Sequence, residues 1–104
     1  MCGATSEGVS LDGVDLGRES VIQGVVTRGR PGGGGEPVTN AYVRLLDRTG
    51  EFTAEVPTTS AGEFRFFAAP GEWTVRTLAP KADIVDRKVL AQRGVVAEVT
   101  VAVG

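Results

Sequence analysis

The fold is decided by residues 63–78, which read EFRFFAAPGEWTVRTL. On both sides of Pro70-Gly71, apolar and polar side chains alternate with a period of two, which is typical of β-strands with one buried face. Phe64 and Phe66 share one face of the first run, and Trp73 begins the corresponding face of the second. Because Pro-Gly favours a tight reversal of the chain, the stretch predicts two strands joined by a tight turn, with their aromatic side chains in a core.

Similar runs occur along the rest of residues 20–103, and Gly and Pro turns separate them. Residues 95–103 have an apolar side chain at every second position, which is the strongest strand pattern in the chain. Residues 84–90, IVDRKVL, would also suit a helical turn and a half, but no capping residue precedes them, so we interpret them as a strand. Seven strands are expected, at residues 21–27, 40–47, 52–56, 63–68, 72–78, 84–90 and 95–103.

The predicted fold is all-β, a seven-stranded antiparallel β-sandwich formed by residues 20–104. Each run has one apolar face, and two sheets must meet on those faces to bury them. Residues 1–19 show no sustained period and carry four Gly and four carboxylates, so they are expected to form a flexible or docked N-terminal arm. The expected core residues are Leu45, Phe52, Phe64, Phe66, Trp73, Val75, Val99 and Val101.

Composition excludes several classes of function. The chain has 104 residues, which is enough for one domain. Its formal net charge is −2, which disfavours binding to nucleic acid or to an anionic membrane. It contains no His and one Cys, which excludes Ser-His-Asp and Cys-His catalysis as well as imidazole and thiolate metal sites. No metal and no cofactor are predicted. There is no run of roughly 20 apolar residues and no export signal, so a cytoplasmic location is expected.

Four motifs resemble those of the carboxypeptidase regulatory-like and transthyretin-like (prealbumin-like) superfamily. They are Gly24-x-Val26, Pro37-Val38-x-x-Ala41-x-Val43, Thr58/Thr59 with Gly62-x-Phe64-x-Phe66, and Pro70-Gly71-x-Trp73-x-Val75. The resemblance implies a seven-stranded sandwich, in agreement with the alternating pattern. It does not carry over the hydroxyisourate hydrolase activity of some transthyretin-like proteins, since that activity depends on histidines and this chain has none.

The chain is also similar, over nearly its whole length, to a small bacterial family labelled SseC-like. The resemblance rests on the opening MCGA and on the strings AYVRLLD, GEFTAEV, FRFFAAPG and WTVR. That family is associated with thiosulfate sulfurtransferases through gene neighbourhood. The resemblance therefore implies a connection with sulfur metabolism and a thiosulfate sulfurtransferase as the expected partner.

Cys2 is the candidate sulfur acceptor, because it is the only thiol of the chain. If the initiator Met is removed, the thiol lies beside an α-ammonium group, whose positive charge favours the thiolate. A thiolate on a Gly-rich arm could enter the active site of a partner and accept a sulfane sulfur. The alternative is an unreactive, solvent-exposed thiol in a reducing compartment.

Three arginines form a second candidate site. Arg44, Arg65 and Arg76 occupy outward positions of three predicted strands. If these strands are neighbours in one sheet, the guanidinium groups converge on a site for an anion or an acidic partner surface. The alternative is that each arginine pairs with a nearby Glu on a solvated face, where an ion pair contributes about 0–1 kcal/mol.

Tyr42 and Phe67 lie on the same outward faces, which suggests a surface that is covered by the arm, by a second copy of the chain in a homo-oligomer, or by a partner. The predicted function is a non-catalytic accessory protein of sulfur metabolism, which binds a thiosulfate sulfurtransferase and accepts sulfur on Cys2. The alternative is a general protein- or carbohydrate-binding module without sulfur chemistry. No enzymatic function is expected, since no nucleophile is paired with a base.

Overall fold

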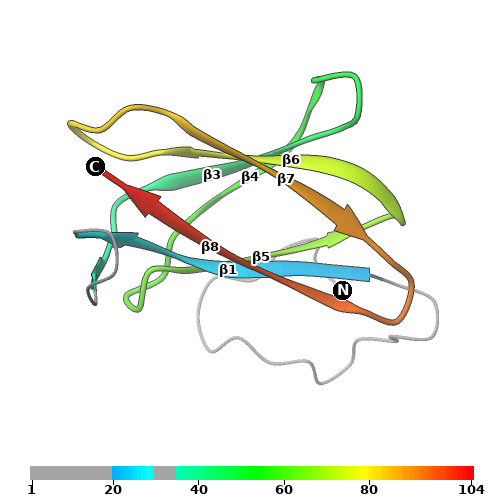
Figure 1. Cartoon of the computed structure of the whole chain (residues 1–104), viewed down its shortest axis with the longest axis horizontal. Helices are drawn as coiled ribbons and strands as arrows, with labels where there is room; N and C mark the ends of the chain where they lie inside the picture. The colour runs from blue at the N-terminus through cyan, green and yellow to red at the C-terminus, as the bar shows by residue number, and fades with distance from the viewer. Residues whose placement is uncertain (1–19, 30–34) are drawn as a thin grey trace.

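The computed structural model describes residues 20–29 and 35–104, which form strands and no helix. None of these residues therefore belongs to a helix that could cross a membrane. The strands lie in two layers, which Figure 1 shows one above the other. They are β1 (Ser20–Arg28), β2 (Glu36–Pro37), β3 (Tyr42–Leu46), β4 (Phe52–Pro57), β5 (Glu63–Ala68), β6 (Gly71–Leu78), β7 (Val85–Ala91) and β8 (Val96–Val103).

Two sheets form the sandwich. Sheet A has β1 at its centre, with β8 on one side and both β5 and the short β2 on the other. Sheet B has the order β4-β3-β6-β7, and its neighbouring strands are all antiparallel. The all-β sandwich expected from the alternating sequence is confirmed. The strand interpretation of residues 84–90 is also confirmed, because β7 covers residues 85–91.

β1 and β8 pair in parallel, from Val21 opposite Val96 to Arg28 opposite Val103. The other pairings between described strands are antiparallel, so the sandwich differs from the expected one in this pair and in the additional β2. Alternation does not indicate which strands are neighbours or in which direction they run, because a strand buries the same face beside either kind of partner. As a result, the strands nearest the two ends of the sandwich sequence lie side by side (Figure 1).

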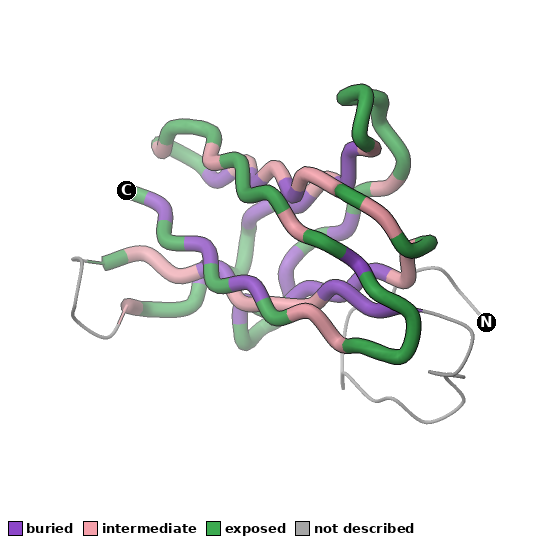
Figure 2. Tube along the Cα trace, turned by 45° about the vertical axis from the view of Figure 1, so that its right-hand side comes forward, coloured by how far each residue is buried: buried purple, intermediate pink, exposed green. Residues whose placement is uncertain are grey.

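The core lies between the two sheets, and buried and exposed residues alternate along β8 as its sequence pattern predicts (Figure 2). The Phe64 and Phe66 rings are 6.1 Å apart and inclined at 53°. Trp73 is partly buried and packs against this cluster. Six of the expected core residues are confirmed as buried: Leu45, Phe64, Phe66, Val75, Val99 and Val101.

Phe52 is not a core residue, contrary to the expectation from the sequence, because it is 61% exposed. The register of β3 against β4 shifts between Leu45 and Leu46, and Phe52 pairs with Leu46 beyond this shift. A β-bulge of this kind interrupts the strict alternation of faces. The pattern that directs Val56 toward the core therefore does not extend to Phe52.

Gly24 lies at the centre of sheet A, between Phe64 of β5 and Val99 of β8. A Cβ atom at this position would collide with the carbonyl oxygen of Val99 and with the Phe64 ring. Sterics therefore explain why the Gly24-x-Val26 motif has glycine at position 24, since a glycine within a strand often marks a close approach of neighbouring groups.

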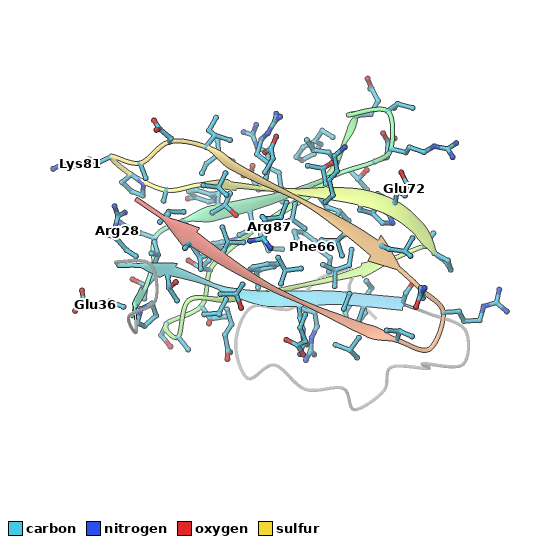
Figure 3. All side chains as sticks on the ribbon, viewed as in Figure 1. Arg28, Glu36, Phe66, Glu72, Lys81 and Arg87 are labelled. Carbon is cyan, nitrogen blue, oxygen red and sulfur yellow. The ribbon has the colours of Figure 1, made fainter. Side chains whose placement is uncertain are left out.

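Arg87 joins the two sheets on the side where β7 and β8 lie next to each other. In register it lies opposite Val75, a core residue, and residues that are paired across strands share a face. Arg87 therefore points toward sheet A, where its Nη1 donates a hydrogen bond of 3.0 Å to the carbonyl oxygen of Thr100 (Figure 3). This bond links β7 of sheet B to β8 of sheet A, which do not pair as strands.

Candidate functional site

The candidate side chains from the sequence are divided between the two outer faces of the sandwich. Arg44 of β3 and Arg76 of β6 lie opposite each other in sheet B, and Tyr42 lies on the same face. Arg65 and Phe67 belong to β5, which is in sheet A. The predicted convergence of three guanidinium groups is therefore wrong, because β3 and β6 are neighbours but β5 belongs to the opposite layer.

Arg44 and Arg76 form the middle of a charged row across the outer face of sheet B. Arg44 Nε donates to Glu55 Oε1 at 2.6 Å. Arg76 Nε and Nη2 donate to the two carboxylate oxygens of Asp86 at 2.9 and 3.0 Å. Like charges directly opposite each other destabilise a sheet. Here each arginine has a carboxylate on its far side, which offsets the repulsion.

The pairing of Arg76 with Asp86 shifts the pKa of both groups. The hydrogen bond and the charge of Asp86 raise the pKa of Arg76. The hydrogen bond from Arg76 lowers the pKa of Asp86, against a smaller opposing effect of burial. The two side chains are 38% and 43% exposed, so water screens the pair and it contributes little to stability. The carboxylate of a partner could therefore replace Asp86 at small cost.

An apolar strip, which consists of Pro57, Tyr42 and Leu78, adjoins this charged row. Tyr42 of β3 lies in register between Pro57 of β4 and Leu78 of β6. Its side chain is 51% exposed, and Ile84, just before β7, is 58% exposed. An exposed aromatic ring beside arginines is typical of surfaces that bind proteins.

Arg65 is only 2% exposed, although the alternation placed it on a solvated face. Its Nε and Nη2 both donate to Oε1 of Gln23, at 3.0 and 2.9 Å, and Gln23 Nε2 donates to Glu98 Oε2 at 2.8 Å. Burial lowers the pKa of Arg65, while the charges of Glu63 and Glu98 act in the opposite direction. Because a guanidinium group stays charged in proteins, Arg65 is a buried cation in a hydrogen-bonded row and does not form an open anion site with Arg44 and Arg76.

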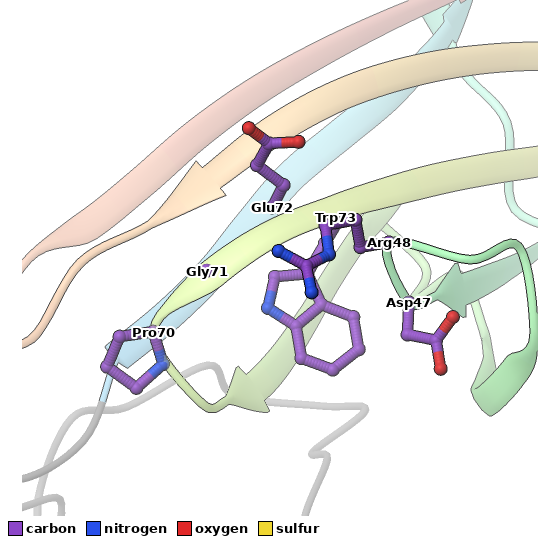
Figure 4. Close-up of a pocket in the computed structure, with 6 residues that line it drawn as sticks. All are labelled: Asp47, Arg48, Pro70, Gly71, Glu72 and Trp73. Carbon is purple, nitrogen blue, oxygen red and sulfur yellow. The ribbon is translucent and has the colours of Figure 1, made fainter.

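A hollow of about 280 Å³, which the sequence does not predict, lies at one end of the sandwich (Figure 4). A second hollow of about 450 Å³ is formed by residues of β6 and β7. Trp73 lines both, and its Nε1 donates to the carbonyl oxygen of Ala69 at 2.8 Å. The first hollow is lined by Asp47, Arg48, Pro70, Gly71, Glu72 and Trp73, and the second by Glu72, Trp73, Lys88, Val89 and Leu90.

Asp47 fixes the turn that carries Arg48 to the first hollow. Its Oδ1 accepts hydrogen bonds from the backbone N–H of Thr49 and Glu51, at 2.9 and 3.0 Å, and from Thr49 Oγ1 at 2.7 Å. These bonds lower the pKa of Asp47. An Asp at the start of a turn is recognisable in sequence. The approach of this turn to Trp73 is set by tertiary structure and has no local signal.

The two hollows beside Trp73 present charged and apolar side chains that can contact a partner. The residues that line the two hollows include no Ser, Thr or Cys. Within residues 20–29 and 35–104, no group of three or more His, Cys, Asp or Glu side chains is placed to hold a metal ion. Cys2, the candidate sulfur acceptor, lies outside the described residues.

Residues 2–103 match a family model described as "Protein of unknown function (DUF1416)". The chain belongs to the DUF1416 family. Two relatives from Mycobacterium tuberculosis (strain ATCC 25618 / H37Rv), the uncharacterized proteins Rv0814c and Rv3118, are each 50% identical over 80 residues. That match covers 76% of this chain and 76% of each relative. An uncharacterized protein of Mycolicibacterium smegmatis is 57% identical over 67 residues, which cover 64% of this chain and 70% of the relative.

Solved structures support the sandwich architecture of this DUF1416 protein. The major pilin subunit BcpA of Bacillus cereus matches 83% of the chain with a TM-score of 0.70 and 17% identity, and the match covers 29% of the pilin. Chlorocatechol 1,2-dioxygenase from Pseudomonas putida matches 88% of the chain with a TM-score of 0.59 and 11% identity, and the match covers 62% of that enzyme. At these identities the similarity shows the fold alone, and neither the family description nor the names of the relatives specify a reaction.

Proposed function

We propose that this DUF1416 protein is a non-catalytic accessory protein of sulfur metabolism, which binds a thiosulfate sulfurtransferase and accepts a sulfane sulfur on Cys2. The observation that carries the proposal is the separation of the thiol from the sandwich. Cys2 is the only Cys of the chain and lies in the segment before β1, whereas residues 20–104 contain neither Cys nor His. The sandwich then supplies a docking surface, and the preceding segment supplies the reactive sulfur.

The choice of partner rests on the resemblance to the SseC-like family, to which the opening MCGA contributes. The DUF1416 match begins at residue 2 and so includes the thiol. A sulfurtransferase also supplies what this chain lacks, an active site that activates the sulfur donor. Accepting sulfur requires only that a thiolate reach the donor.

The reach of the thiol is sufficient for delivery into a partner. Fully extended, the chain from Cys2 to Ser20 spans roughly 60 Å. The longest dimension of the molecule is 37 Å. A thiol on such a segment can therefore enter an active site while the sandwich is docked elsewhere on the partner.

The transfer is a thiol exchange that needs no external oxidant or reductant. The sulfurtransferase takes the outer sulfur of thiosulfate as a cysteine persulfide and releases sulfite. The Cys2 thiolate then attacks the outer sulfur of that persulfide, so that a new S–S bond forms on Cys2 while the S–S bond of the donor breaks. The electron pair of the broken bond leaves with the enzyme cysteine as its thiolate.

The docking surface is the outer face of sheet B. Tyr42 provides an exposed apolar contact there, and Arg44 and Arg76 provide two cations beside it. Because their own carboxylate partners are solvent-exposed and only weakly held, the arginines suit a partner surface that carries Asp or Glu.

The test is to incubate the protein with an active thiosulfate sulfurtransferase and thiosulfate, and to measure its intact mass. The expected result is an added mass of one sulfur atom on Cys2, which a thiol reductant removes. Cys2→Ser is expected to gain nothing, and so is the unchanged protein without the enzyme. If the enzyme turns over thiosulfate and Cys2 stays unmodified, the sulfur-accepting role is excluded.

Docking is tested separately by the affinity of variants for the same enzyme. Tyr42→Ala is expected to weaken binding at least about tenfold, as truncation of an aromatic anchor does in other interfaces. Phe52→Ala is the matched control, because Phe52 is an aromatic even more exposed than Tyr42, and it lies at the start of β4, outside the apolar strip. Equal losses from both substitutions would contradict docking through the strip.

The second candidate function is a protein-binding module without sulfur chemistry, which the exposure of Tyr42 beside Arg44 and Arg76 supports equally well. Partner binding that is unchanged in Cys2→Ser, together with no sulfur on Cys2, would favour it. A carbohydrate ligand is the weaker version of this candidate. Tyr42 and Phe67 lie in different sheets, so these two rings cannot form one stacking platform.

A further inference from the structure

One edge of β8 pairs with β1 along its whole length, and no described strand pairs with the other edge. In a parallel pair, successive residues of a strand direct their backbone groups alternately toward the neighbouring strand and away from it. The N–H of Val21 in β1 donates to the carbonyl oxygen of Val95 at 3.2 Å, so Val95 and every second residue after it face β1. The N–H and C=O groups of Glu98, Thr100 and Ala102 therefore point to the free edge.

The hydrogen bond from Arg87 indicates the same orientation of β8. Arg87 Nη1 reaches the carbonyl oxygen of Thr100 from β7, at 3.0 Å, and not from the side of β1 (Figure 3). The side chains of Glu98, Thr100 and Ala102 are exposed as well. The free edge of β8 is thus accessible, and a guanidinium group binds the carbonyl oxygen at its middle.

β8 differs from the other strands at the edges of the two sheets. Charged side chains and Pro protect edge strands from pairing with another chain. All the others contain them: Glu36 and Pro37 in β2, Glu55 and Pro57 in β4, Glu63 and Arg65 in β5, and Asp86, Arg87 and Lys88 in β7. After Glu98, β8 continues as VTVAV, a run without charge or Pro that is rich in β-branched residues. The charge at this edge comes from Arg87 of the opposite sheet.

We infer that Arg87 prevents a second copy of the chain from pairing with the free edge of β8. Two identical strands that pair antiparallel are related by a two-fold axis. An axis at Thr100, the middle of the three edge-facing residues, places Glu98 of one copy opposite Ala102 of the other. The same axis brings together the Arg87 guanidinium groups of both copies. They repel each other there, and each occupies a carbonyl oxygen that the new strand pair would need.

The positive charge of Arg87 has no carboxylate partner that would relieve this repulsion. Within the described part of the chain, Arg44 and Arg76 form ion pairs and Arg87 forms none. Glu98 is the only carboxylate of β8, and it lies on the outer face of sheet A, where it accepts a hydrogen bond from Gln23. Arg87 approaches β8 from the core side. Strand pairing over Arg87 would therefore bury an unpaired charge, which is costly.

This inference goes beyond the proposed function and does not rest on it, because the proposed docking surface is the outer face of sheet B. The test is the mass of the purified protein in solution, measured by sedimentation over a range of concentrations. A thiol reductant is present so that Cys2 cannot cross-link two chains. With only this chain in the sample, any strand that pairs with β8 comes from a second copy.

Arg87→Met removes the charge and keeps a long side chain. We expect this variant to sediment with at least about twice the mass of the unchanged protein. Arg93→Met is the matched control, because Arg93 is exposed in the turn before β8 and its loss changes the net charge equally. The control is expected to keep the mass of the unchanged protein. An unchanged mass for a folded Arg87→Met variant, or equal association of both variants, would overturn the inference.

A second substitution identifies the surface through which the Arg87→Met variant associates. Thr100→Pro removes an N–H that points away from β1, so the pairing of β8 with β1 is kept. Combined with Arg87→Met, it is expected to restore the mass of the unchanged protein. If a folded double variant still associates, another surface is responsible and the inference is wrong.

Hydrogen exchange of the unchanged protein tests the open edge without any substitution. The amides of Glu98, Thr100 and Ala102 are expected to exchange with solvent much faster than those of Val99 and Val101, which face β1. Similar protection of all five amides would show that the edge of β8 is already covered. Arg87 would then have no open edge to protect, and the inference would fail whether or not the variants fold.

Discussion

Thr77 carries a buried hydroxyl group in the middle of β6. It is 0% exposed, and its Oγ1 has no hydrogen-bond partner among the described residues. Its neighbours in register are Val43 and Val85. A buried hydroxyl without a partner costs stability, because it loses its hydrogen bonds to water and gains none.

Replacing that hydroxyl with a methyl group should therefore stabilise the protein. We expect Thr77→Val to raise the free energy of unfolding by about 1 kcal/mol, measured by urea denaturation. Thr58→Val is the control, because Thr58 Oγ1 is also buried but accepts a hydrogen bond from the backbone N–H of Ala41 at 3.2 Å. Thr58→Val should lower the free energy of unfolding by about 1 kcal/mol. A loss at Thr77 as large as that at Thr58 would show that its hydroxyl is bonded.

Gly24 makes a second residue-scale prediction. We expect Gly24→Ala to lower the free energy of unfolding by about 3 kcal/mol, the upper end of the usual cost of overpacking. The added methyl group meets a backbone carbonyl, that of Val99, which a side-chain rotation cannot move aside. Gly104→Ala is the control, since a Cβ there meets nothing. A difference below about 1 kcal/mol between the two variants would mean that β8 can shift away.

At the scale of single residues, sequence predicts burial well where the strands are regular. Phe64, Phe66 and Val101 were predicted as core residues from alternation and are buried. Phe52 was not predicted correctly, because a bulge changes the face without leaving a mark in the alternation. The burial of Arg65 was not predicted either, because it depends on contacts beyond its own strand, including the hydrogen bonds to Gln23 of β1.

At the scale of strands, the Arg76–Asp86 ion pair between β6 and β7 makes the stability of the protein depend on pH. The folded protein holds the pKa of Asp86 below its ordinary value of 3.8 through the hydrogen bond from Arg76. The stability from this pair is therefore complete above that value and is lost as the pH falls through the lower pKa of the folded form. Asp47, whose pKa is lowered by its own turn, contributes in the same direction.

We expect Asp86→Asn to reduce, but not abolish, the loss of stability between about pH 5 and about pH 2. The reduction should be below about 1 kcal/mol, because both side chains of the pair are partly exposed. Urea denaturation at several pH values measures it. If the variant lost stability with falling pH as steeply as the unchanged protein, the pair would be absent in solution.

The positions of strands follow from local sequence, whereas their neighbours do not. Pro70-Gly71 and the runs on either side predicted β5 and β6 almost to their ends, but the two strands belong to different sheets. This separation is why Arg65 does not join Arg44 and Arg76, and why the hollow beside Trp73 was not predicted. Both features depend on how distant segments meet.

At the scale of the whole molecule, sheet A depends on β8. Removal of residues 93–104 would strip one edge of β1 from Val21 to Arg28 and remove Val99, Val101 and Val103 from the core. Each buried Val contributes about 1.5–3 kcal/mol, against a total stability of about 5–15 kcal/mol for a domain. We expect this shortened chain to show no cooperative thermal unfolding by circular dichroism. Removal of Gly104 alone, the control, should leave the transition unchanged.

The parallel pairing of β1 with β8 also bears on when the protein can fold during its synthesis. β1 is among the first parts of the sandwich to leave the ribosome, but its partner on one side is not complete until Val103 has emerged. Until then the central strand of sheet A exposes an unpaired edge, which is where nascent chains are prone to aggregate. Chaperones that act on emerging polypeptides are therefore expected to be needed longer for this sandwich than for one that closes by hairpins alone.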